Sequence, residues 1–252
     1  MTASTNTAAK FWDPRTDRRA YVVWFALAAL GLLVGFGGDV VRYLSERPAP
    51  PLIMHLHGVV FVAWLVLVGV QIFLVEKGNV RLHKTLGWAT VIVAGGMVPL
   101  GVTAAFVDEA RRLHQPDSDP HFLALEFNDV IAFAIFTVAG VLLRRDPASH
   151  KRLMVLSAVA ISDAGFGRIS TGILRVNPTG PIAWWLTYYW GVALILVGMI
   201  GWDIHRRRRV HPALIVGAAV LWGGETISAI LFYTPGWKAL MTGSVKAWGW
   251  VG

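Results

Sequence analysis

The sequence predicts an all-α polytopic membrane protein, a bundle of seven transmembrane helices. The chain has 252 residues, 55% of them hydrophobic, and its mean hydropathy is +0.56. This is more apolar than an ordinary soluble domain. Seven apolar runs reach the roughly 20 residues that cross the hydrocarbon layer. Basic residues gather in alternate connecting loops. Together these observations place most of the chain in a bilayer.

The apolar segments follow one another with short connections, and four of them start at a proline. Proline is tolerated there because its missing N–H would be unpaired anyway. The four are Pro51, Pro120, Pro181 and Pro212. The predicted spans are 20–43, 52–75, 85–107, 122–143, 153–174, 181–202 and 212–233. They divide the chain into a cytoplasmic tail (1–19), a transmembrane domain (20–233) and an extracytoplasmic C-terminal tail (234–252).

Lysine and arginine are unevenly distributed between the two sides, and short cytoplasmic loops carry the excess of positive charge. With the N-terminus inside, the cytoplasmic side holds fifteen: Lys10, Arg15, Arg18, Arg19, Lys77, Arg81, Lys84, Arg144, Arg145, Lys151, Arg152 and Arg206 to Arg209. The other side holds seven: Arg42, Arg47, Arg111, Arg112, Arg175, Lys238 and Lys246. We therefore predict an N-in, C-out topology. The run "HRRRRVH" is interpreted as a topology anchor facing anionic lipid, not as a nucleic-acid site.

Two stretches resemble each other, "EKGNVRLHKTLGW" at 76–88 and "RRDPASHKRLMVL" at 144–156. Each has a His-Lys-x-Leu motif after a charged loop and before an apolar run. The two histidines, His83 and His150, are 67 residues apart. This pattern predicts a tandem repeat of a helical hairpin, with the second and third helices as one copy and the fourth and fifth as the other.

Cysteine is absent from the chain. Disulfides, thiolate metal ligands, iron–sulfur clusters and a cysteine nucleophile are therefore excluded. Any metal would be bound by histidine, aspartate or glutamate.

Several ionisable side chains fall within the predicted spans, where they are costly and usually face the bundle interior. At a rise of 1.5 Å per residue, most of them lie about 15–27 Å from the cytoplasmic edge. We predict that they form a polar chamber in the outer half of the membrane, open to the outside. Its predicted members are His57, Asp129, Arg168, Glu225, Asp39 and Asp163.

Two interpretations of this chamber stay open. His57, Asp129 and Glu225 could ligate a divalent transition metal, since their ligand types suit iron, zinc or manganese. Alternatively, Arg168 pairs with Glu225 or Asp129, and the buried ion pair only fixes helix packing.

The repeated histidines are predicted at the cytoplasmic ends of the third and fifth helices. Free helix N–H groups and neighbouring basic side chains favour a lipid-phosphate interface there. Its members would be His83, Lys84, His150, Lys151 and Arg152. In the competing interpretation, His83 and His150 approach each other across the bundle and ligate one metal or haem.

At "HLHGVVFVAWLVLVGVQ", "LHKTLGW", "FLALEFND" and "RRDPASHKRLM", the chain resembles a group of bacterial seven-helix membrane proteins with HKxLG and HKRLM motifs. The resemblance covers residues 52–170, implies a bacterial inner membrane and supplies no activity. More loosely, the chain is similar to transmembrane di-haem b-type cytochromes that reduce ferric iron or regenerate ascorbate. That likeness implies haem b and gives His57, His83 and His150 as candidate haem ligands, although the matching third core helix has no histidine within its span.

Three classes of function remain open, and no catalytic residue is assigned. The first is a haem- or metal-dependent redox protein acting with a quinone-like small molecule, on which the aromatic run Trp184, Trp185, Tyr188, Tyr189 and Trp190 could stack. The second is a carrier, receptor or assembly subunit without chemistry of its own, and such a subunit would join an oligomer or a membrane complex. The third is a metal-dependent membrane hydrolase. Apart from a kink expected at Pro99, the sequence shows no glycine or proline interruption within a span, which argues against a carrier.

Overall fold

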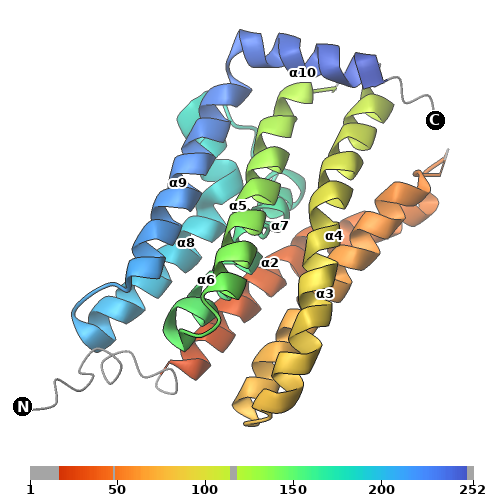
Figure 1. Cartoon of the computed structure of the whole chain (residues 1–252). Coiled ribbons are helices and arrows are strands. Elements are labelled where there is room, and N and C mark those ends of the chain that lie inside the picture. Colours follow the sequence, from red (N-terminus) through yellow and green to blue (C-terminus); the bar gives the residue numbers. More distant parts are fainter. Residues whose placement is uncertain (1–16, 48, 114–117, 249–252) are drawn as a thin grey trace, which may run out of the picture.

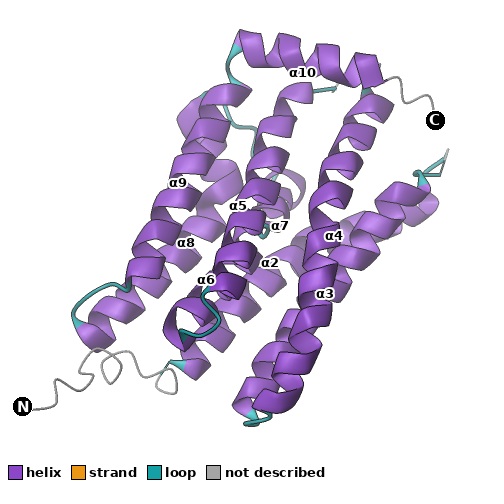
Figure 2. Ribbon diagram, in the orientation of Figure 1, coloured by secondary structure: helices purple, strands orange, loops and turns teal. Residues whose placement is uncertain are grey.

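The computed structural model describes residues 17–47, 49–113 and 118–248. Within these ranges the chain consists of helices and loops (Figure 2). The elements are α2 (Arg18–Ser45), α3 (Leu52–Glu76), α4 (Val80–Arg112), η1 (Pro120–Phe122), α5 (Leu123–Leu142), α6 (Pro147–Ala160), α7 (Asp163–Arg168), η2 (Ile169–Ile173), α8 (Pro181–Arg207), α9 (Pro212–Phe232) and α10 (Pro235–Trp248).

Seven spans in the described part of the chain are long and apolar enough to cross a membrane, and η1–α5 and α6–α7–η2 each count as one of them. This confirms the predicted all-α bundle and identifies an integral membrane protein. Large apolar side chains such as Leu52, Ile92 and Leu142 are 69–80% exposed, as expected of a surface that faces lipid.

The bundle has two ends, which we name after the elements that mark them (Figure 1). At the Asp17 end lie the start of α2, the α3–α4 and α5–α6 turns, and the loop between α8 and α9. At the α10 end, α10 lies across the bundle and contacts α4, η1 and α9. The stretch predicted as a C-terminal tail thus contains a helix that packs Met241 and Val245 against the bundle.

The two hairpin turns begin their second helices in the same way. Asn79 accepts a hydrogen bond from the Leu82 N–H (3.2 Å), and Asp146 accepts one from the Ala148 N–H (3.0 Å). Each is an N-cap that satisfies a backbone donor at the helix start. Each histidine of the repeated motif stands four residues after its cap, and its N–H bonds to the carbonyl of the capping residue.

The fifth span is the central and the irregular one. It begins at Pro147, six residues before the predicted start. In its most apolar stretch, 78% of the residues are buried, against at most 44% in the other spans. It is not continuous: α6 ends at Ala160, α7 begins at Asp163, and five residues of π-helix follow. The break is not apparent from the sequence, because neither glycine nor proline occurs at Ile161 and Ser162.

Close packing of backbones fixes the irregular segment against α2. A side chain added at Gly35 would meet backbone atoms of Gly165, and one added at Gly165 would meet the backbone of Gly31. Small residues allow membrane helices to approach this closely.

Candidate functional site

Three acidic side chains from three different spans meet inside the bundle. Asp129 lies on α5, Asp163 begins α7 directly after the helix break, and Glu225 lies on α9. They are 8%, 1% and 1% exposed, and Asp129 interacts electrostatically with the other two. At 1.5 Å per residue, Asp129 and Glu225 lie about 10 Å below the α10 end of their helices. We call these three residues the carboxyl cluster.

Several carboxyl oxygens of the cluster have no hydrogen-bond donor. One oxygen of each carboxyl group, Oδ1 of Asp129, Oδ2 of Asp163 and Oε2 of Glu225, is buried and accepts no hydrogen bond from an N–H or O–H group. The carboxyl groups of Asp129 and Asp163 lie close enough to interact with each other. They can hydrogen-bond only when one of them carries a proton, because an ionised carboxylate only accepts.

The helix break places Asp163 in the cluster. The Ser162 hydroxyl donates to the carbonyl of Val159 (2.7 Å), which also accepts from the Ser162 N–H (3.0 Å) where α6 ends. The Ala164 N–H then donates to Oδ1 of Asp163 (2.7 Å). Serine and aspartate favour such local bonds over a continuous helix. This "SD" pair is the sequence signal of the break.

Tyr189 on α8 closes the cluster from a fourth span. It is fully buried, and its hydroxyl lies near Asp129, Asp163 and Glu225. Ser228, one turn along α9 from Glu225, donates to the carbonyl of Ala124 (2.8 Å). Tyr189 was predicted only as a member of an aromatic run, since sequence spacing alone does not show which aromatic faces inward.

Three predicted chamber members are engaged elsewhere. Arg168 donates to Asp39 (2.8 Å), and its guanidinium lies 3.9 Å from the centre of the Phe36 ring. The predicted ion pair of Arg168 with Glu225 or Asp129 is therefore wrong: the partner is Asp39. His57 packs on Phe61 with ring centres 4.0 Å apart. Among the residues that the structure describes, no group of three or more His, Asp or Glu side chains could hold a metal ion, so His57, Asp129 and Glu225 do not form the predicted metal site.

His83 and His150 do approach each other, with ring centres 6.2 Å apart. Nδ1 of His150 donates to the carbonyl of Gly140 (2.8 Å). The Gln71 amide, oriented so that its oxygen accepts from the Gly87 N–H (3.0 Å), donates to Nδ1 of His83 (2.6 Å). Each ring therefore has its Nδ1 occupied, which leaves Nε2 as the nitrogen available to a further ligand.

A second polar cluster lies at the Asp17 end, and its charges are paired. Arg152 is fully buried and donates to both oxygens of Asp203 (2.6 and 3.3 Å). Arg207 donates to both oxygens of Asp17 (2.8 and 2.7 Å). Lys151 also pairs with Asp17, at 3.1 Å. We call these residues the Asp17 network.

This geometry corrects two sequence-based interpretations. Arg152 was predicted to face a lipid phosphate, but its guanidinium is buried against Asp203. Arg207 was interpreted as part of a basic run facing lipid, but it is buried and bonds to Asp17. Asp17 and Asp203 were not predicted as site residues because they lie just outside the predicted spans, where charged residues are common.

Burial and neighbouring charges shift the pKa values of several groups at this end, among them Asp17 and His211. Burial acts to raise the pKa of Asp17, but hydrogen bonds from Arg207 and the charge of Lys151 outweigh it and hold the pKa below its usual value. Burial, reinforced by the charge of Arg152, lowers the pKa of His211 to about 4. His211 is the N-cap of α9 and accepts from the Ala213 N–H through Nδ1 (3.1 Å).

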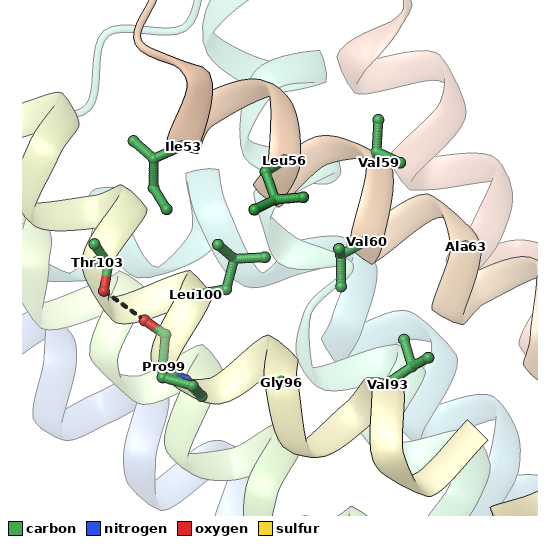
Figure 3. Close-up of a pocket in the computed structure, with 10 residues that line it drawn as sticks. All are labelled: Ile53, Leu56, Val59, Val60, Ala63, Val93, Gly96, Pro99, Leu100 and Thr103. Carbon is green, nitrogen blue, oxygen red and sulfur yellow. Dashed lines mark hydrogen bonds between the residues drawn. The ribbon is translucent and has the colours of Figure 1, made fainter. Parts of the chain in front are cut away.

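A groove of about 570 Å³ lies between α3 and α4 (Figure 3). It is lined by Ile53, Leu56, Val59, Val60, Ala63, Val93, Gly96, Pro99, Leu100 and Thr103. Its one polar side chain, Thr103, donates to the carbonyl of Pro99 (2.7 Å). The groove offers contacts for hydrocarbon and no site for chemistry.

Comparison with protein-family models, with curated proteins and with solved structures finds no match. The fold and its hydropathy thus define the class, a multi-pass integral membrane protein that contacts lipid.

Proposed function

We propose that the protein is a membrane carrier that binds a small organic cation at the carboxyl cluster in competition with protons. The main support is that three buried acids, Asp129, Asp163 and Glu225, lie together. No lysine, arginine or histidine is bonded to them in the described chain. Charged groups at membrane depth are costly unless paired. A bound cation or a proton would neutralise the negative charge of these acids.

The broken fifth span supports a carrier over a static packing role. Carrier sites are commonly built where a spanning helix is discontinuous, near the middle of the bilayer. Asp163 stands at such a break. The six-residue helix α7 that it begins is followed by π-helical residues, which often mark functional sites. Because the fifth span is interrupted between Ala160 and Asp163, the lack of a glycine or proline interruption no longer speaks against a carrier.

The test is charge movement in proteoliposomes on a solid-supported membrane. Methylammonium, guanidinium and tetramethylammonium are added in turn at several pH values, with Na⁺, K⁺ and protein-free liposomes as controls. At least one cation is expected to give a transient current that shrinks as the pH falls, because protons compete for the carboxyl groups. Asp129→Asn and Glu225→Gln should each abolish it. Currents that neither variant changes would refute the proposal.

A second candidate, electron transfer, is favoured by one observation, the approach of His83 and His150. The occupied Nδ1 atoms resemble the outer-shell bonds that orient metal-ligating histidines. A haem iron or a transition metal ion bound there would supply one-electron chemistry. His83 and His150 would hold it, Gln71 and Gly140 would fix their rings, and the proposed quinone-like partner would exchange the electron.

An absorption spectrum of the purified protein, oxidised and dithionite-reduced, tests this candidate together with elemental analysis. A Soret band lost in His83→Ala and His150→Ala but retained in His57→Ala would support it. A colourless protein without stoichiometric metal would exclude it and leave the carrier.

A further inference from the structure

A second pair of acids lies between the carboxyl cluster and the α10 end. Glu109 is near the end of α4 and is 1% exposed, and Glu126 is on the first turn of α5. Oε1 of Glu109 accepts from Arg112 (3.1 Å), but its Oε2 has no hydrogen-bond partner. Oε2 of Glu126 is likewise buried without a partner. We call Glu109 and Glu126 the vestibule pair.

The vestibule pair continues into the cluster. Glu109 interacts electrostatically with Glu126, and Glu126 with Asp129. Glu126 and Asp129 are three residues apart on α5, so they share a helix face and are about 4.5 Å apart along the axis. Acidic groups therefore follow one another from the α10 end to Asp163.

The surroundings keep this series acidic. Arg111 is engaged by Glu46 (2.8 Å) and Arg112 by both Asp108 and Glu109 (3.1 Å each). Only Arg112 among these bonds to the vestibule pair in the described residues. Neighbouring acids in a low-dielectric setting attract cations and repel anions when they are ionised.

Helix α10 covers this end. Trp237 donates from its indole to the carbonyl of His121 (3.1 Å). Met241 and Val245 are buried with Leu123, the first residue of α5. The aromatic ring of Trp248 packs on Phe106 at 4.7 Å between ring centres. The cover thus rests on α4 and on the start of α5, the two helices that carry the vestibule pair.

We infer that Glu109 and Glu126 form a cation-selective access route from the α10 end to the carboxyl cluster. This inference rests on the proposed cation-binding function and names its route. Small cations reach Asp129 from beneath α10, whereas anions are repelled.

Thiol labelling tests the route without knowledge of the transported cation, because the chain has no native cysteine. Asp129→Cys is reacted with a cationic and an anionic methanethiosulfonate of similar size, added to the α10 side of sealed vesicles. Ser228→Cys, a buried neighbour on α9, serves if the first variant does not fold. Lys246→Cys, on the exposed face of α10, controls for reagent activity and vesicle orientation.

The cationic reagent is expected to label Asp129→Cys at least tenfold faster than the anionic one, a modest degree of electrostatic steering. Adding Glu109→Gln and Glu126→Gln should reduce this preference severalfold, because only Asp163 and Glu225 then remain acidic near the thiol, while Lys246→Cys keeps its rates. Equal rates for both reagents, labelling only from the Asp17 end, or no labelling at either buried position would overturn the route. Failure of the carrier proposal is read separately, from cation currents that ignore Asp129→Asn and Glu225→Gln.

Discussion

The two buried polar clusters differ in one respect, whether their charges are paired. In the Asp17 network every acid is bonded to arginine: Arg207 holds both oxygens of Asp17, and Arg152 holds both oxygens of Asp203. In the carboxyl cluster of the described chain, no lysine, arginine or histidine is bonded to the acids, and the charge of Arg168 acts on Asp163 only from a distance. Because both clusters are buried, burial alone does not distinguish a structural cluster from a candidate functional site. The paired charges of the Asp17 network hold helices together, whereas the acids of the carboxyl cluster are the proposed cation site.

The largest expected effect comes from breaking the paired cluster. Arg152→Met removes two hydrogen bonds to the buried Asp203 and leaves it only the His211 N–H (3.0 Å) and the more distant Arg207 (4.0 Å), which should lower the free energy of unfolding by about 3 kcal/mol. Thermal unfolding in detergent measures it, with the exposed Arg206→Met as the matched control. Adding Asp203→Leu to Arg152→Met should restore much of the loss, since both charges are then gone. A double variant as unstable as the single one contradicts this account of the network.

A smaller effect is expected from crowding the helix that carries Asp163. Gly165→Ala pushes a methyl group into the backbone of α2 and should cost about 1–3 kcal/mol. Gly37→Ala, on α2 where nothing lies within 4 Å, is the control and should be neutral or stabilising. Unfolding in detergent is the readout. Similar behaviour of the two variants would mean that the contact between α2 and α7 does not hold the break in place.

The unpaired cluster should respond in the opposite way to the paired one. Glu225→Gln breaks no ion pair, so the free energy of unfolding should stay within about 1 kcal/mol of the wild type. The same variant should abolish cation current. A large loss of stability in Glu225→Gln would place Glu225 among the structural charges and remove the contrast between the clusters.

The smallest effect concerns pH at the Asp17 end. The pKa of His211 is about 4 in the folded protein and near 6.5 when unfolded. Because the folded pKa is depressed, the contribution is fully present above pH 6.5 and is lost as the pH falls toward 4. His211→Asn keeps a capping side chain but does not titrate, so its stability should depend less on pH in this window. Identical pH profiles of unfolding for variant and wild type would contradict the assignment.

The sequence predicted the seven spans well, because hydropathy over about 20 residues is a direct consequence of the bilayer. It also identified Asp129, Asp163 and Glu225 by their depth. It did not predict that Arg168 pairs with Asp39, since two helices from distant parts of the chain meet only in three dimensions. The break before Asp163 escaped notice because hydrogen bonds of Ser162 and Asp163, not glycine or proline, produce it.

We propose that Asp129 and Asp163 share a proton that a bound cation displaces. Infrared difference spectroscopy of the protein in lipid, labelled with ¹³C-carboxyl aspartate, detects this proton. The account predicts a protonated-carboxyl band at neutral pH that shifts with the label, is lost in Asp163→Asn and diminishes when the transported cation is added. A labelled protein without that band at neutral pH would contradict the claim.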